Sequence, residues 1–253
     1  MCSVVIARNC LTDWPILLAA NRDEMLDRPW QPPARHWPDR AEVIAGLDEL
    51  AGGTWLGLND FGVVATILNR KHTLGPADGK RSRGELVLEA LDHADAAAAI
   101  EALMALNAQA YRPFNMLIAD NQHAAVLIGR GEGAVDRQDI PDGVSMITNA
   151  DLNDHESARI GAHLPAFKAA TLPNPAADDW AGWIEVLAAR DDNDPVNGMS
   201  IPNTGGFGTG SSALIALPSI EQASTKPVFK FAAGAPDVTR FVALDDLRDA
   251  KSA

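Results

Sequence analysis

Cysteine occupies the second position of the chain, directly before an apolar run at residues 3–7. Cysteine is small enough for routine removal of the initiator methionine, after which Cys2 would carry both a thiol and a free α-amine. The usual pKa is about 8.5 for a thiol and about 7.7–8.0 for an α-amine, so a nucleophile and its general base would share one residue. This arrangement suits amide and ester cleavage. The alternative is a small buried residue at the start of a strand.

Four consecutive polar residues, 21–24, follow a second apolar run at residues 16–20. The two runs predict a hairpin that brings these polar residues back beside the N-terminus. There the carboxylate of Asp23 could hold the α-ammonium group of Cys2, and the guanidinium of Arg22 could lower the pKa of the thiol. Neighbours on a strand alternate between its faces, so Arg22 is expected on the other face. The alternative is a solvated turn.

Composition limits the class of protein and of partner. The chain has 253 residues, of which 47% are hydrophobic, as is typical of a globular protein with a substantial core. A net charge of −13 disfavours binding to nucleic acid or to anionic membranes.

No apolar stretch approaches the roughly 20 residues that cross a bilayer, and no signal-peptide pattern is present. Cys2 and Cys10 form no disulfide framework, so we expect a cytoplasmic protein with a single domain over residues 1–253.

Apolar periodicity and turn residues predict the secondary structure. Strands are predicted at residues 3–8, 16–20, 53–58, 63–68, 114–119, 124–128, 144–148, 212–217, 228–231 and 238–244. Helices are predicted at residues 82–93, 95–107, 154–169 and 178–189, the first with a capping box of Ser82 and Glu85. Residues 29–38 are expected to form an irregular loop, and residues 204–210 a flexible segment or tight turn. Because strands and helices are grouped and do not alternate, the fold class is predicted as α+β, with antiparallel sheets covered by helices.

Short motifs along nearly the whole chain resemble the NRDE family, the group related to the transport-and-Golgi-organisation protein. They are Met-Cys at 1–2, Ala-Asn-Arg-Asp-Glu at 20–24, Gly-Gly-Thr-Trp-Leu-Gly at 52–57, Leu-Asn-Arg at 68–70, Ser-Arg-Gly at 82–84, Phe-Asn-Met-Leu at 114–117, Thr-Asn-Ala-Asp-Leu at 148–152 and Phe-Gly-Thr-Gly-Ser-Ser at 207–212. The resemblance implies the N-terminal nucleophile hydrolase fold, a four-layer α-β-β-α sandwich.

The chain is more distantly similar to penicillin V acylases and bile salt hydrolases, in which Arg-Asn-x-Asp follows an N-terminal cysteine. Here Asp23 matches, but Ala20 stands at the arginine position. The resemblance implies that the side chain of Asn149 helps to form an oxyanion hole, and Asn69 lies where a second donor is expected. Either asparagine could instead be a turn residue at the end of a strand. The NRDE motif usually has arginine where this chain has Gly210.

Basic residues are concentrated between positions 70 and 83 of this acidic chain. Five of the 21 lysines and arginines lie there: Arg70, Lys71, Lys80, Arg81 and Arg83. This segment is either a solvated loop or a rim that captures a carboxylate or phosphate, with Arg70 and Arg83 as candidate ligand-binding residues. Trp55 is a candidate for the wall of an apolar pocket, although packing in the core is the usual role of tryptophan.

Two functions therefore stay open. In the first, Cys2 attacks a carbonyl carbon of a small-molecule amide or thioester, without a cofactor or metal, and the substrate is anionic if the basic rim binds it. In the second, the resemblance implies a non-catalytic protein that binds or transports haem, acyl-CoA or lipid on the same scaffold. Haem would then need Cys2 or a histidine as its ligand, because the sequence has no Cys-Pro haem motif.

Overall fold

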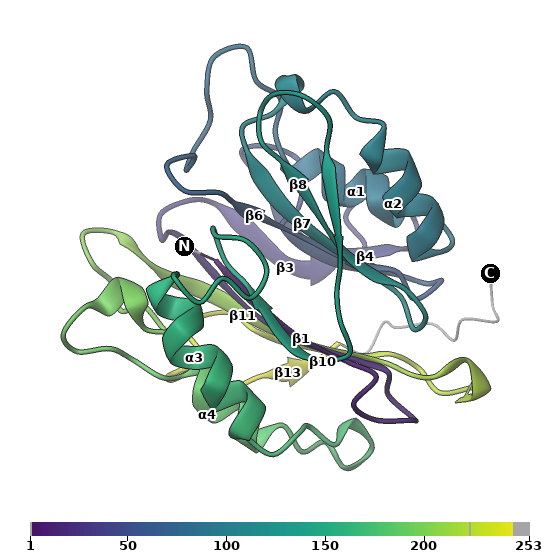
Figure 1. Ribbon diagram of the computed structural model, residues 1–253, viewed down its shortest axis with the longest axis vertical. Helices are drawn as coiled ribbons and strands as arrows, with labels where there is room; N and C mark the ends of the chain where they lie inside the picture. Colours follow the sequence, from purple (N-terminus) through teal and green to yellow (C-terminus); the bar gives the residue numbers. More distant parts are fainter. Residues whose placement is uncertain (1, 223, 245–253) are drawn as a thin grey trace. The chain divides into compact units, whose positions relative to one another are not determined.

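The computed structural model describes residues 2–222 and 224–244, which divide by their contacts into two compact units (Figure 1). The first unit comprises residues 2–28, 141–218 and 227–244, and the second comprises residues 29–140 with 219–222 and 224–226. Each unit holds one antiparallel sheet and two α-helices. The predicted α+β class is therefore confirmed, while a single domain over residues 1–253 stays a prediction.

The first unit is built on a six-stranded antiparallel sheet in the order β10-β1-β2-β11-β12-β13. Its strands are β1 (Ser3–Arg8), β2 (Ile16–Met25), β10 (Gly143–Ile147), β11 (Phe207–Leu217), β12 (Val228–Ala232) and β13 (Val242–Ala243). β1 and β2 form the predicted hairpin. β2 runs past its predicted end through residues 21–24, because β11 pairs along it from Phe207 onwards. The turn at residues 204–206 is therefore shorter than predicted.

Helices α3 (Ala158–Ala169) and α4 (Ala181–Leu187) pack on one face of this sheet (Figure 1). Side chains at alternate strand positions, such as Val5, Ala19 and Leu214, form one buried core with Leu164 of α3 and Trp183 of α4. Short 3₁₀ helices occupy Pro175–Ala177 and Pro195–Asn197. Within the described residues of both units, no helix is long and apolar enough to cross a membrane.

The second unit is built on a seven-stranded antiparallel sheet in the order β3 to β9. Its strands are β3 (Trp30–Ala34), β4 (Val43–Asp48), β5 (Leu56–Asn59), β6 (Val64–Asn69), β7 (Phe114–Ala119), β8 (Ala124–Gly129) and β9 (Asp136–Asp139). Its helices are α1 (Gly84–Leu91) and α2 (Ala96–Met104), and 3₁₀ turns occur at Ala108–Ala110 and Ile220–Gln222. Leu86 and Leu103 of the helices share a core with Ala65 and Ile118 of the strands, so both helices cover one face.

Several local predictions for the second unit were wrong. The proline-rich segment forms β3, an edge strand where proline is tolerated because the missing N–H faces away from the ladder. β4 and β9 were not predicted, since Gly46 interrupts the apolar run of β4 and all four residues of β9 are exposed. The capping box does not form: Ser82 Oγ accepts from the N–H of Gly84, and Glu85 accepts a hydrogen bond from Tyr111 instead.

Candidate functional site

Cys2 lies immediately before the first residue of β1, between two neighbouring strands of the first unit. The observed registers, extended past Ser3, place Cys2 opposite Arg22 on the β2 side and opposite Asn149 on the β10 side. Residues directly opposite each other in an antiparallel sheet share a face. Arg22 is therefore on the same face as Cys2, which corrects the expectation that it points away, and two predicted site residues flank the cysteine.

The thiol of Cys2 lies in a partly buried environment that favours its neutral form. Its Sγ donates to the backbone oxygen of Asp23 at 3.6 Å. Burial raises the pKa of the Cys2 thiol above its ordinary value, and the negative charge of Asp23 raises it further, while the positive charge of Arg22 lowers it. The thiol therefore needs a base to become an efficient nucleophile near neutral pH.

The side chain of Asp23 points to the opposite, helix-covered face of the sheet, where it takes part in a fully buried polar cluster. Its Oδ2 accepts from Arg159 Nη1 at 2.8 Å, and its Oδ1 accepts from Thr209 Oγ1 at 2.6 Å. The same Arg159 nitrogen donates to Ser3 Oγ at 2.8 Å. Asp23 thus reaches Cys2 through its backbone oxygen, and its carboxylate has the Arg159 guanidinium as a cationic partner. A contact between this carboxylate and an α-amine stays a prediction.

Arg159 was not among the predicted site residues, although its side chain is only 1% exposed and is central to this cluster. It lies on α3, far along the chain from Asp23, so no local spacing connects the two. The sequence gives only a weak indication that Arg159 is buried, namely its position directly before the apolar stripe that begins at Ile160. Asn21 of the family motif is structural, since its Nδ2 donates to the backbone oxygens of Leu187 and Met199.

The remaining predicted site residues lie in the second unit. Asn69 is the last residue of β6. The next residue, Arg70, donates from Nη1 to Oδ1 of the buried Asn115 at 2.6 Å. Arg83 donates from Nη1 to Thr73 Oγ1 at 3.1 Å and from Nη2 to the Thr73 backbone oxygen at 3.0 Å. The roles of Asn69, Arg70 and Arg83 in ligand binding stay predictions.

Arginine side chains hold the basic segment in a defined conformation. Arg83 binds Thr73, near the start of this segment, and the Arg112 guanidinium donates to four backbone oxygens between residues 72 and 76. Lys80 donates to the backbone oxygen of Gln109 at 2.6 Å. These contacts fix parts of the backbone, while most residues between 71 and 81 are exposed to solvent, so both interpretations of the segment stay open.

Trp55 is half-buried and packs against other residues of the second unit. Its ring stands edge-on to that of Trp30, with centroids 5.8 Å apart. It also covers Gly46 so closely that a Cβ added there would lie 2.4 Å from the ring. Packing accounts for this ring position, and contact of Trp55 with a ligand stays a prediction.

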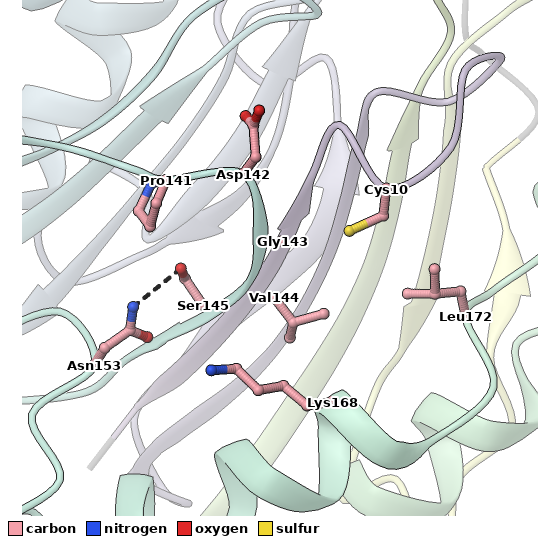
Figure 2. Close-up of a pocket in the computed structure, with 9 residues that line it drawn as sticks. All are labelled: Cys10, Pro141, Asp142, Gly143, Val144, Ser145, Asn153, Lys168 and Leu172. Carbon is pink, nitrogen blue, oxygen red and sulfur yellow. Dashed lines mark hydrogen bonds between the residues drawn. The ribbon is translucent and has the colours of Figure 1, made fainter.

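A separate hollow of about 430 Å³ in the first unit includes none of the predicted site residues. Figure 2 shows Cys10 and Lys168 beside it, and the hydrogen bond from Asn153 Nδ2 to Ser145 Oγ at 3.1 Å on its far side. The Cys10 thiol donates to the Arg8 backbone oxygen at 3.6 Å, and burial raises its pKa. Across the described part of both units, no cluster of three or more His, Cys, Asp or Glu residues could hold a metal ion.

Three solved structures with a similar fold are named as hydrolases or their orthologs. An N-acylethanolamine-hydrolyzing acid amidase ortholog from Caenorhabditis elegans superposes with a TM-score of 0.61 at 14% identity, covering 97% of this chain and 94% of that one. Two variants of the conjugated bile acid hydrolase from Clostridium perfringens give TM-scores of 0.51 and 0.53 at 11% and 10% identity, covering 97% and 96% of each chain. These likenesses show that the predicted N-terminal nucleophile hydrolase fold is present.

Sequence comparison identifies the family. The chain is 34% identical over 108 residues to the Transport and Golgi organization 2 homolog of Mus musculus, and 36% identical over 110 residues to that of Bos taurus. Each alignment spans 42% of this chain but only 38% of the relative. The family model described as Transport and Golgi organisation 2 matches residues 1–198, which is most of the chain. The chain therefore belongs to the Transport and Golgi organisation 2 family.

Proposed function

We propose that this protein hydrolyses a linear C–N amide bond, or a thioester, of a small molecule, with Cys2 as the nucleophile after removal of Met1. The observation that carries the proposal is the placement of Cys2 before β1, opposite Arg22 and Asn149. The names of the similar solved structures, an amidase and a conjugated bile acid hydrolase, support the same class of reaction.

In the first half of the reaction, the free α-amine of Cys2 removes the thiol proton, directly or through a water molecule. The raised pKa of the thiol makes this base necessary, and the nearby charge of Arg22 favours the thiolate once it forms. The sulfur bonds to the carbonyl carbon, and the carbonyl oxygen becomes an oxyanion. We assign the Asn149 side chain as one donor to this oxygen, a contribution that is typically about 2.7–4 kcal/mol of the barrier.

In the second half, the tetrahedral intermediate collapses to a thioester on Cys2. The C–N bond breaks, and the α-ammonium group gives its proton to the leaving amine. A water molecule then loses a proton to the α-amine and attacks the thioester carbon, which releases the carboxylic acid and restores the thiol. Asp23, held by Arg159, fixes the strand end whose backbone oxygen accepts from Cys2.

The experiment that tests this function measures the release of primary amines, by fluorescamine, from a panel of small N-acyl amines. Thioester substrates in the same panel are followed by the release of free thiol. Wild-type protein and the Cys10→Ala variant should release product, and Cys2→Ala should not. Equal rates for wild type and Cys2→Ala, or no release from any member of the panel, would contradict the proposal.

A further inference from the structure

A β-bulge in β11 decides which side chain lies across from Arg22. Thr209 pairs with Asp23, but the register then shifts, so that Ser211 and not Gly210 pairs with Arg22. The extra residue thus places a serine where an unbroken ladder would place a glycine. Bulges are frequent beside active sites, where they redirect a side chain.

The bulge completes a row of three side chains on one face of the sheet. Cys2 lies opposite Arg22 on one side, and Ser211 lies opposite Arg22 on the other. Opposed residues of antiparallel strands share a face, so Cys2, Arg22 and Ser211 point to the same side of β1, β2 and β11. This is the face opposite to the one that carries the cluster of Asp23 and Arg159.

The hydroxyl of Ser211 has no hydrogen-bond partner among the residues that the structure describes, although the residue is only 1% exposed. Its neighbour Ser212 is equally buried, but it points to the helix-covered face and donates to Asn21 Oδ1 at 2.7 Å. An unpaired buried hydroxyl is unfavourable, so the hydroxyl of Ser211 is available to a partner that arrives with a ligand.

The surroundings of Ser211 suit a carboxylate. Arg22 is only 7% exposed, and a buried guanidinium binds carboxylates through paired N–H donors, to which a hydroxyl can add one more. Gly210 leaves space at this point: a Cβ added there would meet only Leu26 at 3.6 Å and Arg22 Nη1 at 4.0 Å. The chain as a whole is strongly acidic, with a net charge of −13, so a small anion would need such a local cation.

We propose that Arg22 and Ser211 form a carboxylate-binding pair beside Cys2, and that the substrate is a small amide or thioester with a carboxylate close to the bond that is cut. This inference rests on the proposed function and names the substrate class of the same site. Ser211, which was not among the predicted site residues, is assigned as a ligand-contacting residue.

Two alkylating reagents with the same reactive carbon test the pair. Iodoacetate carries a carboxylate, and iodoacetamide carries a neutral amide in its place. The rates at which each alkylates Cys2 and Cys10 are measured by peptide mass spectrometry on the native full-length protein. The ratio of the iodoacetate rate to the iodoacetamide rate should be about tenfold higher at Cys2 than at Cys10, as expected for one charge-assisted hydrogen-bonded contact.

The two neighbouring serines provide a matched pair of variants. Ser211→Ala should lower the ratio at Cys2 by about threefold, since the Arg22 guanidinium stays in place, without lowering the thermal unfolding midpoint, because the hydroxyl has no partner to lose. Ser212→Ala should lower the unfolding midpoint, because it breaks the bond to Asn21, and should leave the ratio unchanged. Arg22→Gln should remove the preference for iodoacetate at Cys2.

Three results would overturn the assignment of Arg22 and Ser211 as a carboxylate-binding pair. They are an unchanged rate ratio at Cys2 in Ser211→Ala, an equal fall of that ratio in Ser212→Ala, and no alkylation of Cys2 by either reagent in the native protein. The readout is separate from hydrolysis. A preference for iodoacetate without amide or thioester cleavage would overturn the proposed function and leave the pair standing. Cleavage of an amide or thioester together with an unchanged ratio in Ser211→Ala would support the proposed function and overturn the carboxylate-binding pair.

Discussion

Arg159 and Asp23 form an ion pair of 2.8 Å in which both side chains are almost completely enclosed, with exposed fractions of 1% and 0%. The pair joins α3 to β2, and Thr209 of β11 donates to the other carboxylate oxygen. Because the backbone oxygen of Asp23 accepts from the Cys2 thiol, this cluster fixes the position of the strand end next to the proposed nucleophile.

Replacement of Arg159 should therefore destabilise the fold strongly. Arg159→Met leaves the Asp23 carboxylate buried without its cation, which typically costs about 3–5 kcal/mol. The free energy of unfolding is measured by urea titration. Arg40→Met is the control, since Arg40 pairs with Asp92 at the surface and such pairs contribute about 0–1 kcal/mol. Equal losses in the two variants would contradict this account of the buried pair.

Acid should weaken the same region through His163, one helical turn beyond Arg159. The imidazole Nε2 lies 3.0 Å from the Asn197 backbone oxygen. Burial lowers the pKa of His163, and the positive charge of Arg159 lowers it further, so the folded state favours the neutral ring. The stabilisation is present above the ordinary imidazole pKa of about 6.5 and is lost as the pH falls below it.

The test compares thermal unfolding of wild type and His163→Gln between pH 7.5 and pH 5 (glutamine can still donate to the Asn197 oxygen). The unfolding midpoint of the wild type should fall more steeply with acid than that of the variant. Parallel pH profiles would show that His163 does not contribute to the acid sensitivity.

Gly46→Ala should displace the ring of Trp55. The new methyl group would lie 2.4 Å from a ring carbon, and overpacking of this kind typically costs about 1–3 kcal/mol. Near-ultraviolet circular dichroism reports the Trp30–Trp55 pair, and urea titration reports the stability. Gly210→Ala is the steric control, because the closest atom to its Cβ is 3.6 Å away. An unchanged spectrum in Gly46→Ala would contradict the packing described for Trp55.

Asn149→Ala should slow acylation of Cys2 by about 10²–10³-fold if its side chain stabilises the oxyanion. The rate is measured with 4-nitrophenyl acetate, by the mass increase of the intact protein. Asn149 is only partly buried, so the free energy of unfolding should change by less than about 1 kcal/mol. A loss of stability with a normal acylation rate would make Asn149 a structural residue.

Local patterns were sufficient for the elements that lead to Cys2. The apolar run of β1, the turn after it and the polar end of β2 are adjacent in sequence, so their hairpin could be predicted together with the return of residues 21–24 to the N-terminus. The Thr-Asn motif after β10 was likewise placed beside Cys2, through its resemblance to a known family and not through any spacing in this chain.

The rest of the site depends on contacts between distant segments, which leave little trace in a single sequence. Arg159 and Asp23 meet only because α3 packs over β2, and each looks like an ordinary charged residue in its own segment. Ser211 pairs with Arg22, on the face that carries Cys2, only because of the bulge at Gly210; an unbroken ladder would have placed glycine there. The edge strand β3 was not predicted because proline is excluded from the interior strands of a sheet but tolerated at its edge, and the sequence does not show which strands lie at an edge.

The most direct test of the central claim is the intact mass of the protein purified from its native cell, before and after brief exposure to 4-nitrophenyl acetate. We predict the mass of a chain that begins at Cys2, followed by the gain of one acetyl group that peptide analysis locates on that residue. Retained Met1, or an acetyl group found only elsewhere on the chain, would contradict the assignment of Cys2 as a nucleophile with its own base.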